Sequence, residues 1–433
     1  MPARPLASLS KWAQDARVLW SGLVLVHVVV LILSIPYILS GELGGDLPVY
    51  AKWASDAVDR GQWPVFATDW VYPAGALLPI VGSRVLGAGL YTVVWVVLVG
   101  VANGIALQAL IRRGRFVRSQ WAPGFWVLTI AVLAAVDLLR LEGFTAPIVV
   151  VGMLFLGSRP WVAGFLLAAA TWIKVWPAAV IASAVVATSR RWIVLITGAA
   201  VSLLVSSIVL IGGGGAHLDS FVTQQNGRAL QVEAPLATPW LWMSLARVPG
   251  AHLIHNRVLL TEEVTGPGDQ WLVSHATAVM FIVMAALIVV LAVATRRLST
   301  LPHALGREVD LVLVGALALA SAFIVFNKVG SPQYVLWLTP IVVVGLVLRP
   351  PDWKTPAILA LVVAGLTTLV YPVLYIPLLD LAPIALIVLG ARNVMLVVVL
   401  AWSVVKLVRA AFVRPAVPLG TRPMGSPVRS TSY

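Results

Sequence analysis

The sequence contains no cysteine, which excludes disulfide bonds and thiolate catalysis and argues against a thiolate metal site. Charged residues are also scarce. They make up 11% of the 433 residues, whereas a soluble protein carries about 25%. Hydrophobic residues make up 60% of the chain. No water-soluble fold buries that much apolar surface, so the composition predicts a polytopic membrane protein.

A nucleotide-binding signature is missing as well. No glycine-rich loop follows an apparent strand, which disfavours ATP or a nucleotide sugar as a direct substrate. The net charge of +13 is compatible with a nucleic-acid partner, but the Lys and Arg residues lie mainly in short loops between apolar runs. That distribution is typical of the positive-inside rule, so we expect anionic membrane lipids as partners and no nucleic acid.

Apolar runs predict an all-α bundle of about twelve membrane helices. The first run is long enough to span a membrane and lacks a clear cleavage site, so we expect an uncleaved helix. Several other runs are shorter than the roughly 20 residues of a full span, which suggests broken or re-entrant helices. The runs lie at 18–40, 86–111, 124–140, 145–158, 161–173, 176–188, 192–212, 272–295, 309–326, 334–348, 355–372 and 383–408.

Basic residues predict the orientation, because alternating crossings put seventeen of the 30 Lys and Arg residues on one side, which should be the cytoplasm. They are Lys11, Arg17, Arg112, Arg113, Arg115, Arg118, Arg159, Arg190, Arg191, Arg296, Arg297, Arg307, Arg349, Lys354, Lys406, Arg409 and Arg414. We therefore expect a cytoplasmic N-terminus at 1–17 and a membrane domain at 18–414. The Pro-, Arg- and Ser-rich segment 415–433 should be a disordered cytoplasmic tail.

Two long loops, about 41–85 and 213–271, should face the opposite side of the membrane. Both contain acids, and the second is rich in Trp, a residue favoured at the headgroup boundary. Residues 49–57 carry apolar positions at helical spacing and follow Pro48, which predicts a short interfacial helix. His252 and His255 in the second loop would share one face of a helix, but no His pair shows a convincing metal spacing.

Two acids of the first loop are candidates for chemistry. An acid at the edge of a bilayer is costly to bury partly, and therefore usually has a function or a strong partner. Asp46 is either a general base for an acceptor hydroxyl or the N-cap of the interfacial helix. Asp69 either holds the acceptor sugar or caps the next helix.

Cationic residues at the same side are candidates for binding a phosphate. Lys174 interrupts an apolar run at the outer level, where it either binds a lipid phosphate or extends to the headgroups. Lys328, Ser331, Gln333 and Tyr334 lie in one tight outer turn that suits a sugar phosphate.

Two further arginines lie in or beside apolar segments. Arg392 interrupts the last apolar run, where it either serves the site or pairs with Asp380. Arg140 and Glu142 flank the tight outer turn between the third and fourth helices, and either serve the site or pair with each other.

Four short motifs share this side of the membrane and follow one another in a fixed order. They are Gly-Asp-Leu-Pro-Val-Tyr at 45–50, Asp-Trp-Val-Tyr-Pro at 69–73, Ile-Lys-Val-Trp-Pro at 173–177 and Asn-Lys-Val-Gly-Ser-Pro-Gln-Tyr at 327–334. Together they resemble glycosyltransferase family 87, the actinobacterial mannosyltransferases of the GT-C fold, over most of the chain up to Arg392-Asn393. The usual Tyr-Pro-Pro reads Tyr72-Pro73-Ala74 here, which leaves the subfamily, the acceptor and the donor sugar open.

The resemblance implies a multi-pass enzyme of the bacterial plasma membrane whose active site faces the extracytoplasmic side. It implies polyprenyl-phosphate-mannose as donor and a glycolipid acceptor of the phosphatidylinositol mannoside or lipomannan type. The transfer would be inverting and would need neither metal nor cofactor, with Asp46 as catalytic base. Lys174, Lys328, Arg392 and Gln333 would bind the donor phosphate. The substrate site would include Asp69, Tyr50, Tyr72, Arg140, Glu142, Ser331 and Tyr334.

Other functions remain open from the residues alone. A flippase or transporter of lipid-linked sugars commonly shows paired repeats with charges near the midplane, whereas the charges here cluster at the outer boundary and no repeat is visible. A related arabinofuranosyltransferase and a non-catalytic envelope scaffold are further alternatives.

Overall fold

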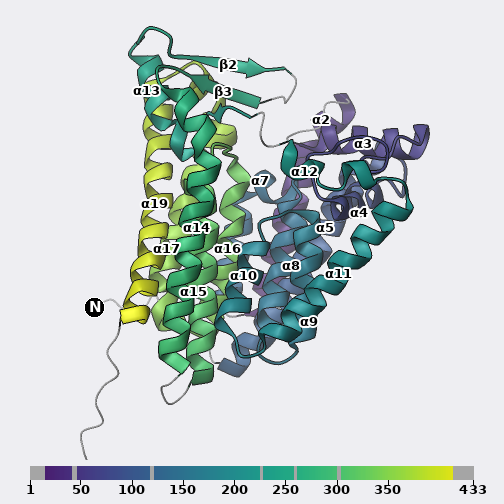
Figure 1. The fold of residues 1–433 in the computed structure, drawn as a ribbon. Coiled ribbons are helices and arrows are strands. Elements are labelled where there is room, and N and C mark those ends of the chain that lie inside the picture. Colours follow the sequence, from purple (N-terminus) through teal and green to yellow (C-terminus); the bar gives the residue numbers. More distant parts are fainter. Residues whose placement is uncertain are drawn as a thin grey trace, which may run out of the picture.

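A computed structural model describes residues 15–40, 46–117, 121–224, 228–257, 261–299 and 304–412. Twelve apolar helices form the bundle in these ranges, and each lies within or overlaps one of the twelve predicted runs (Figure 1). Seven of them are long enough to cross a membrane: α2 (Ala16–Ser40), α5 (Tyr91–Val117), α11 (Arg191–Ile211), α14 (Asp269–Ser299), α15 (Ala304–Val325), α17 (Pro350–Thr368) and α19 (Pro383–Phe412). The all-α polytopic fold predicted from the sequence is thereby confirmed.

Five apolar helices are shorter, four of them between residues 121 and 187 and the fifth near residue 340. They are α6 (Trp121–Leu133), α8 (Glu142–Phe155), α9 (Pro160–Ile173), α10 (Ala178–Ala187) and α16 (Thr339–Leu348). The predicted run 124–140 is broken, because Ala134 has a φ of 42° and separates α6 from a single turn, α7 (Ala135–Leu138). The break ends the straight crossing early and turns the chain toward α8.

The apolar helices differ in length. At about 1.5 Å per residue, the ten residues of α10 and of α16 rise about 15 Å, whereas the 31 residues of α14 rise about 46 Å. The hydrocarbon core of a bilayer is about 30 Å thick. The loops that precede or follow the short helices therefore lie below the ends of the long helices.

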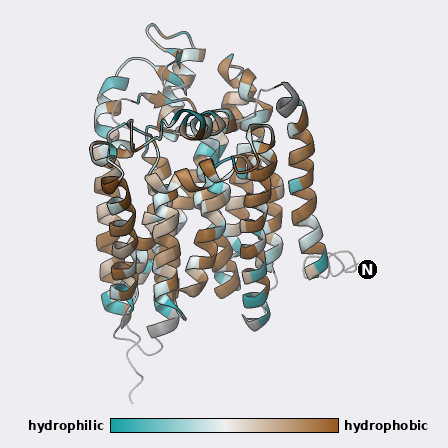
Figure 2. Ribbon diagram, turned by 90° about the vertical axis from the view of Figure 1, so that its right-hand side faces the viewer, coloured by the Kyte–Doolittle hydropathy of each residue, from teal (hydrophilic) through white to brown (hydrophobic). Residues whose placement is uncertain are grey.

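The two ends of the bundle differ in character. The start of α2 and the end of α19 lie at the same end, the lower one in Figures 1 and 2, as an even number of crossings requires. Figure 2 shows apolar residues along the middle of the helices and hydrophilic residues toward both ends. Alternating helix directions place the predicted basic turns at the lower end and both long loops at the upper end.

The first long loop forms the predicted helix. α3 (Leu47–Arg60) begins at Leu47 with Pro48 in its first turn and ends at Gly61, whose φ of 68° closes the helix. Its buried face packs on the bundle, and α3 lies across the upper end in Figure 1. Short helical segments continue this loop: η1 (Ala74–Ala76), α4 (Leu77–Gly82) and η2 (Ala88–Leu90).

The second long loop contains a small sheet that the sequence did not reveal. Its strands are β1 (Leu230–Gln231), β2 (His252–Asn256) and β3 (Thr261–Thr265), antiparallel in the order β1-β3-β2. His252 and His255 therefore lie on a strand and not on a helix, and His255 contacts Glu262 of β3. The same loop holds η3 (Gly215–His217), α12 (Ser220–Thr223), η4 (Pro235–Ala237) and α13 (Thr238–Leu245).

The remaining short elements are η5 (Pro332–Trp337), which leads into α16, and η6 (Leu369–Val373) and α18 (Tyr375–Leu379), which follow α17. The predicted disordered tail at 415–433 and most of the predicted N-terminal segment at 1–17 lie outside the described residues.

Candidate active site

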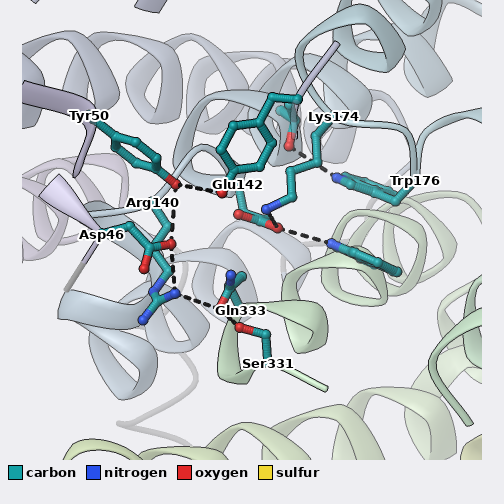
Figure 3. Close-up of polar contacts among 11 residues, drawn as sticks. Asp46, Tyr50, Arg140, Glu142, Lys174, Trp176, Ser331 and Gln333 are labelled. Carbon is teal, nitrogen blue, oxygen red and sulfur yellow. Dashed lines mark hydrogen bonds and ion pairs between the residues drawn. The ribbon is translucent and has the colours of Figure 1, made fainter. Parts of the chain in front are cut away.

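Asp46 is the last residue before α3, but its carboxylate does not cap that helix. Instead, Oδ2 accepts a hydrogen bond of 2.8 Å from Nη1 of Arg140 and one of 3.2 Å from the hydroxyl of Tyr50 (Figure 3). The carboxylate side chain is 29% exposed. Asp46 stands at the N-cap position, but the predicted capping role of its side chain is wrong, because the carboxylate contacts Arg140 and Tyr50 instead.

Arg140 connects two segments that lie far apart in the sequence. It lies in the turn between α7 and α8, and its Nη1 also donates 2.9 Å to Oε1 of Gln333 in η5. The predicted alternative, a pair between Arg140 and Glu142, is wrong. Arg140 turns toward the first long loop, whereas Glu142 begins α8 and turns toward the end of α9.

Glu142 and Lys174 form a buried ion pair. Nζ of Lys174 lies 2.8 Å from Oε1 of Glu142, which is fully buried, while the lysine side chain is 12% exposed. The indole of Trp337 also donates to Oε1 at 3.3 Å (Figure 3). As the first residue of α8, the carboxylate lies at the positive end of that helix dipole. Lys174 therefore does not extend to the headgroups.

Aromatic side chains lie between Asp46 and the Glu142–Lys174 pair. The hydroxyl oxygens of Tyr50 and Tyr72 lie 3.4 Å apart, and Nζ of Lys174 lies 5.0 Å from the centre of the Tyr72 ring. Trp53 packs edge-on against Tyr72, and Trp95 stacks on Tyr50 at 5.2 Å between ring centres. Burial raises the pKa of Tyr50 well above its usual value, so its hydroxyl keeps the proton that it donates to Asp46.

The segment 327–334 is held by the second long loop. The main-chain N–H of Gln231 donates to the carbonyl of Lys328 at 3.0 Å, and the Gln231 side chain accepts from the N–H of Gly330. A Cβ atom on Gly330 would lie 2.2 Å from the nitrogen of Ala234, so only glycine permits this approach. The contact orients Gln333, which Arg140 and the Ser331 hydroxyl both reach.

Arg392 joins the second long loop to the segment 327–334. Its guanidinium is buried and donates to the carbonyl of Glu233 at 2.7 Å, to Oδ1 of Asn393 at 3.0 Å and to the carbonyl of Ser331 at 3.4 Å. The predicted alternative pair with Asp380 is wrong, because Asp380 is exposed and the guanidinium turns toward the loops.

The predicted set of phosphate-binding residues does not converge on a single point. Lys174 lies beside Glu142 and Tyr72, whereas Arg392 connects to Arg140 through Ser331 and Gln333. Lys328 is buried under the second long loop, where desolvation lowers its pKa and the charge of Arg228 adds to that shift. Tyr334, by contrast, stacks on Trp337 at 4.0 Å between ring centres, near the Glu142 pair.

Asp69 joins the two long loops. Its carboxylate accepts from the side chain of Gln224 at 3.3 Å and lies 2.6 Å from Nδ1 of His217. The contact with His217 lowers the pKa of Asp69. The predicted helix-cap alternative is wrong, since both partners belong to the second loop. The side chain remains 51% exposed at the upper surface.

Glu233 is a site residue that sequence reasoning missed. Its side chain is buried, and Oε2 contacts no hydrogen-bond donor in the part of the chain that the structure describes. Burial raises the pKa of Glu233 to about 7, against the opposing charges of Arg392 and Arg140 and with a further rise from Asp46. The signal in the sequence was the apolar surroundings of this acid, Val232 before it and Ala234-Pro235-Leu236 after it.

Comparison with known proteins identifies the family that the four motifs resemble. The model of glycosyltransferase family 87 matches residues 70–265. The match covers most of the Asp69–Pro73 motif and all of Ile173–Pro177, together with Arg140, Glu142 and Glu233, whereas Asp46 and the segment 327–334 lie outside it. No curated protein and no solved structure matches the chain.

Proposed function

We propose that this membrane glycosyltransferase, matched by the family 87 model, transfers mannose from polyprenyl-phosphate-mannose. The acceptor would be a glycolipid or lipoglycan of the phosphatidylinositol mannoside or lipomannan type. The enzyme would act in the bacterial plasma membrane with its site on the extracytoplasmic side. The family match and the motifs support the reaction class, and the side opposite the basic turns supports the orientation.

The observation that carries the proposal is the geometry of Asp46. Both of its hydrogen bonds fall on Oδ2, and within the described ranges no donor contacts Oδ1. Arg140 and Tyr50 therefore fix the direction of the carboxylate and leave one oxygen for an acceptor hydroxyl. A general base needs this combination of a fixed position and an available lone pair.

The proposed reaction is a single displacement at the anomeric carbon. Asp46 takes the proton of the acceptor hydroxyl, whose oxygen forms the new bond to C1 of mannose. The bond between C1 and the phosphate oxygen breaks, and polyprenyl phosphate leaves with the electron pair. Attack on the face opposite the leaving group inverts the configuration, so a β-linked donor gives an α-mannoside.

The leaving phosphate needs positive charge and hydrogen-bond donors, because its charge increases as the bond breaks. Lys174 is the best-placed donor for it, since it lies beside Tyr72 and its side chain is partly exposed. Glu142 would hold Lys174 in position, and Gln333 and Ser331, which Arg140 links to Asp46, would contact the sugar. Tyr72, Tyr334 and the exposed Asp69 would also contact the substrates.

The direct test is sugar transfer by the purified protein in proteoliposomes. Radiolabelled polyprenyl-phosphate-mannose and a phosphatidylinositol mannoside serve as substrates, and the product is analysed for its linkage. We expect Asp46→Asn to lower kcat by about 10²–10⁴-fold, the usual range for a lost general base. Asp59→Asn, on the helix that follows Asp46 and in an exposed pair with Arg84, is the matched control and should retain activity. Full activity of Asp46→Asn would remove the base assignment.

The same assay separates the alternatives. An arabinofuranosyl donor used in place of the mannosyl donor would identify an arabinofuranosyltransferase on the same fold. Movement of labelled lipid across the vesicle membrane without a new glycosidic bond would indicate a flippase. We also expect activity to persist in EDTA, because the family resemblance implies a metal-independent transfer, and a loss that Mg²⁺ restores would contradict this.

A further inference from the structure

A groove of about 940 Å³ lies between α2, α5 and the end of α8. Its walls are almost entirely apolar and include Leu23, Val28, Val97, Val101 and Leu154. α2 stands at the margin of the bundle, beside the N label of Figure 2, and much of its surface faces outward. The groove therefore opens sideways toward lipid.

Two glycines on α5 shape the groove. A Cβ atom on Gly100 would lie 3.1 Å from the ring of His27, and one on Gly104 would lie 3.1 Å from the ring of Trp20. The two side chains of α2 thus pack directly on the backbone of α5, and both line the groove. The two helices touch at these points, and the groove runs beside the contacts along α5.

The two ends of the groove differ in charge. At the lower end, Arg112 and Arg113 line it together with the polar side chains of Gln108 and Ser158. Both arginines are exposed, and neither has an ion-pair partner among the residues that the structure describes. Toward the upper end the lining is apolar, with Val96, Val97 and Leu31.

We propose that this groove binds an anionic phospholipid of the cytoplasmic leaflet, with its phosphate at Arg112 and Arg113 and one acyl chain along α5. The stretch from Val101 to Arg112 rises about 17 Å, close to the roughly 15 Å of hydrocarbon in one leaflet. Basic residues beside the lower membrane surface attract anionic lipid headgroups. The two arginines thus match the phosphate of a lipid, and the length of the apolar groove matches its acyl chain.

The position of the arginines distinguishes this lipid from the sugar donor. Asp46 and Lys174 lie at the upper end of the bundle, whereas Arg112 and Arg113 lie at the lower end of α5. A polyprenyl phosphate that places its phosphate near Lys174 cannot also place it at Arg112. The groove therefore has a different occupant, and the proposal does not depend on the sugar transfer.

The test uses the full chain in nanodiscs that contain phosphatidylglycerol with a diazirine on one acyl chain. Illumination followed by peptide mass spectrometry maps the labelled residues. We expect labels on α2, α5 and α8 along the groove, and several-fold fewer with the same diazirine on phosphatidylcholine. Replacing both arginines, as Arg112→Gln and Arg113→Gln, should reduce groove labelling by roughly 25-fold, since each basic residue contributes roughly fivefold to anionic lipid binding.

Two matched controls keep the test specific. Arg190→Gln with Arg191→Gln removes an adjacent exposed arginine pair at the same end of the bundle and should leave groove labelling unchanged. Val101→Trp fills the groove and should abolish labelling, whereas Ile358→Trp, equally exposed on α17, should not. Equal labelling by both lipids, or labelling unchanged by the arginine and Val101 variants, would overturn the proposal. Displacement of the label by polyprenyl phosphate but not by phosphatidylglycerol would also overturn it.

Discussion

Nη1 of Arg140 lies 2.8 Å from Oδ2 of Asp46, although 94 positions of the sequence separate the two residues. The same nitrogen reaches Gln333, 193 positions further along the chain. One guanidinium thus joins the first long loop, the α7–α8 turn and η5. The direction of the proposed base therefore depends on a contact between three distant segments.

Arg140 should act as a positioning residue for Asp46. Arg140→Gln removes the charge and the link to Gln333, so we expect kcat to fall by about 10²-fold with a smaller change in KM, because a misplaced catalytic group affects the transition state most. Arg140→Lys keeps the charge but not the forked geometry, and should recover only part of the rate. Steady-state mannosyl transfer measures both constants. An increase in KM alone would show that Arg140 binds substrate and does not orient the acid.

The buried pair of Glu142 and Lys174 predicts a recovery of stability in a double variant. Lys174→Met leaves a fully buried carboxylate without its partner, and should lower the stability by about 3–5 kcal/mol. Adding Glu142→Gln removes the unpaired charge and should recover most of that loss. Thermal unfolding in detergent measures the effect.

The same double variant separates structure from function. If Lys174 binds the donor phosphate, the stable double variant should remain inactive in the transfer assay. A double variant that is both stable and fully active would exclude Lys174 from the proposed reaction. Lys52→Met, which breaks an exposed pair with Asp56 on α3, is the control and should change stability by about 1 kcal/mol or less.

Glu233 predicts a pH dependence of stability. Its pKa rises from 4.5 to about 7 on folding, so the native protein binds more protons than the unfolded chain between these values. Stability should therefore fall as the pH rises from about 4.5 to about 7, and should stay lowered above that. The full effect is on the order of 3 kcal/mol.

Glu233→Gln removes this titration. We expect the variant to unfold at a higher temperature than the unmodified protein at pH 8 and at a similar temperature at pH 5. Thermal unfolding measured from pH 4.5 to 8 provides the comparison, with Glu262→Gln on the partly exposed strand β3 as control. Parallel curves for Glu233→Gln and the unmodified protein would contradict the assignment.

Gly330 should not tolerate a side chain. Gly330→Ala places a Cβ atom against the main chain of Ala234, so the segment 327–334 must move and displace Gln333. We expect a lower unfolding temperature and a weaker transfer rate. Gly365→Ala on α17, where a Cβ meets no atom within 4 Å, is the control and should be neutral or slightly stabilising. Equal behaviour of the two variants would show that the segment is free to shift.

The sequence alone determined the features that depend on residues close to one another along the chain. Hydrophobic runs located the twelve apolar helices, and Pro48 with the apolar spacing after it located α3, because both signals are local. The four motifs resemble glycosyltransferase family 87, whose model matches residues 70–265. The break at Ala134 and the small sheet were missed, since the φ of one alanine and the pairing of short polar strands leave no clear local signal.

Only the tertiary structure decided which charges are partners. The sequence placed Arg140 two residues from Glu142 and suggested that they pair, yet the fold turns Arg140 to Asp46 and Glu142 to Lys174. It also buried Glu233 beneath Arg392. In a medium that solvates charge poorly, each buried ion takes the partner that packing brings within about 3 Å, and distance along the chain does not determine that choice.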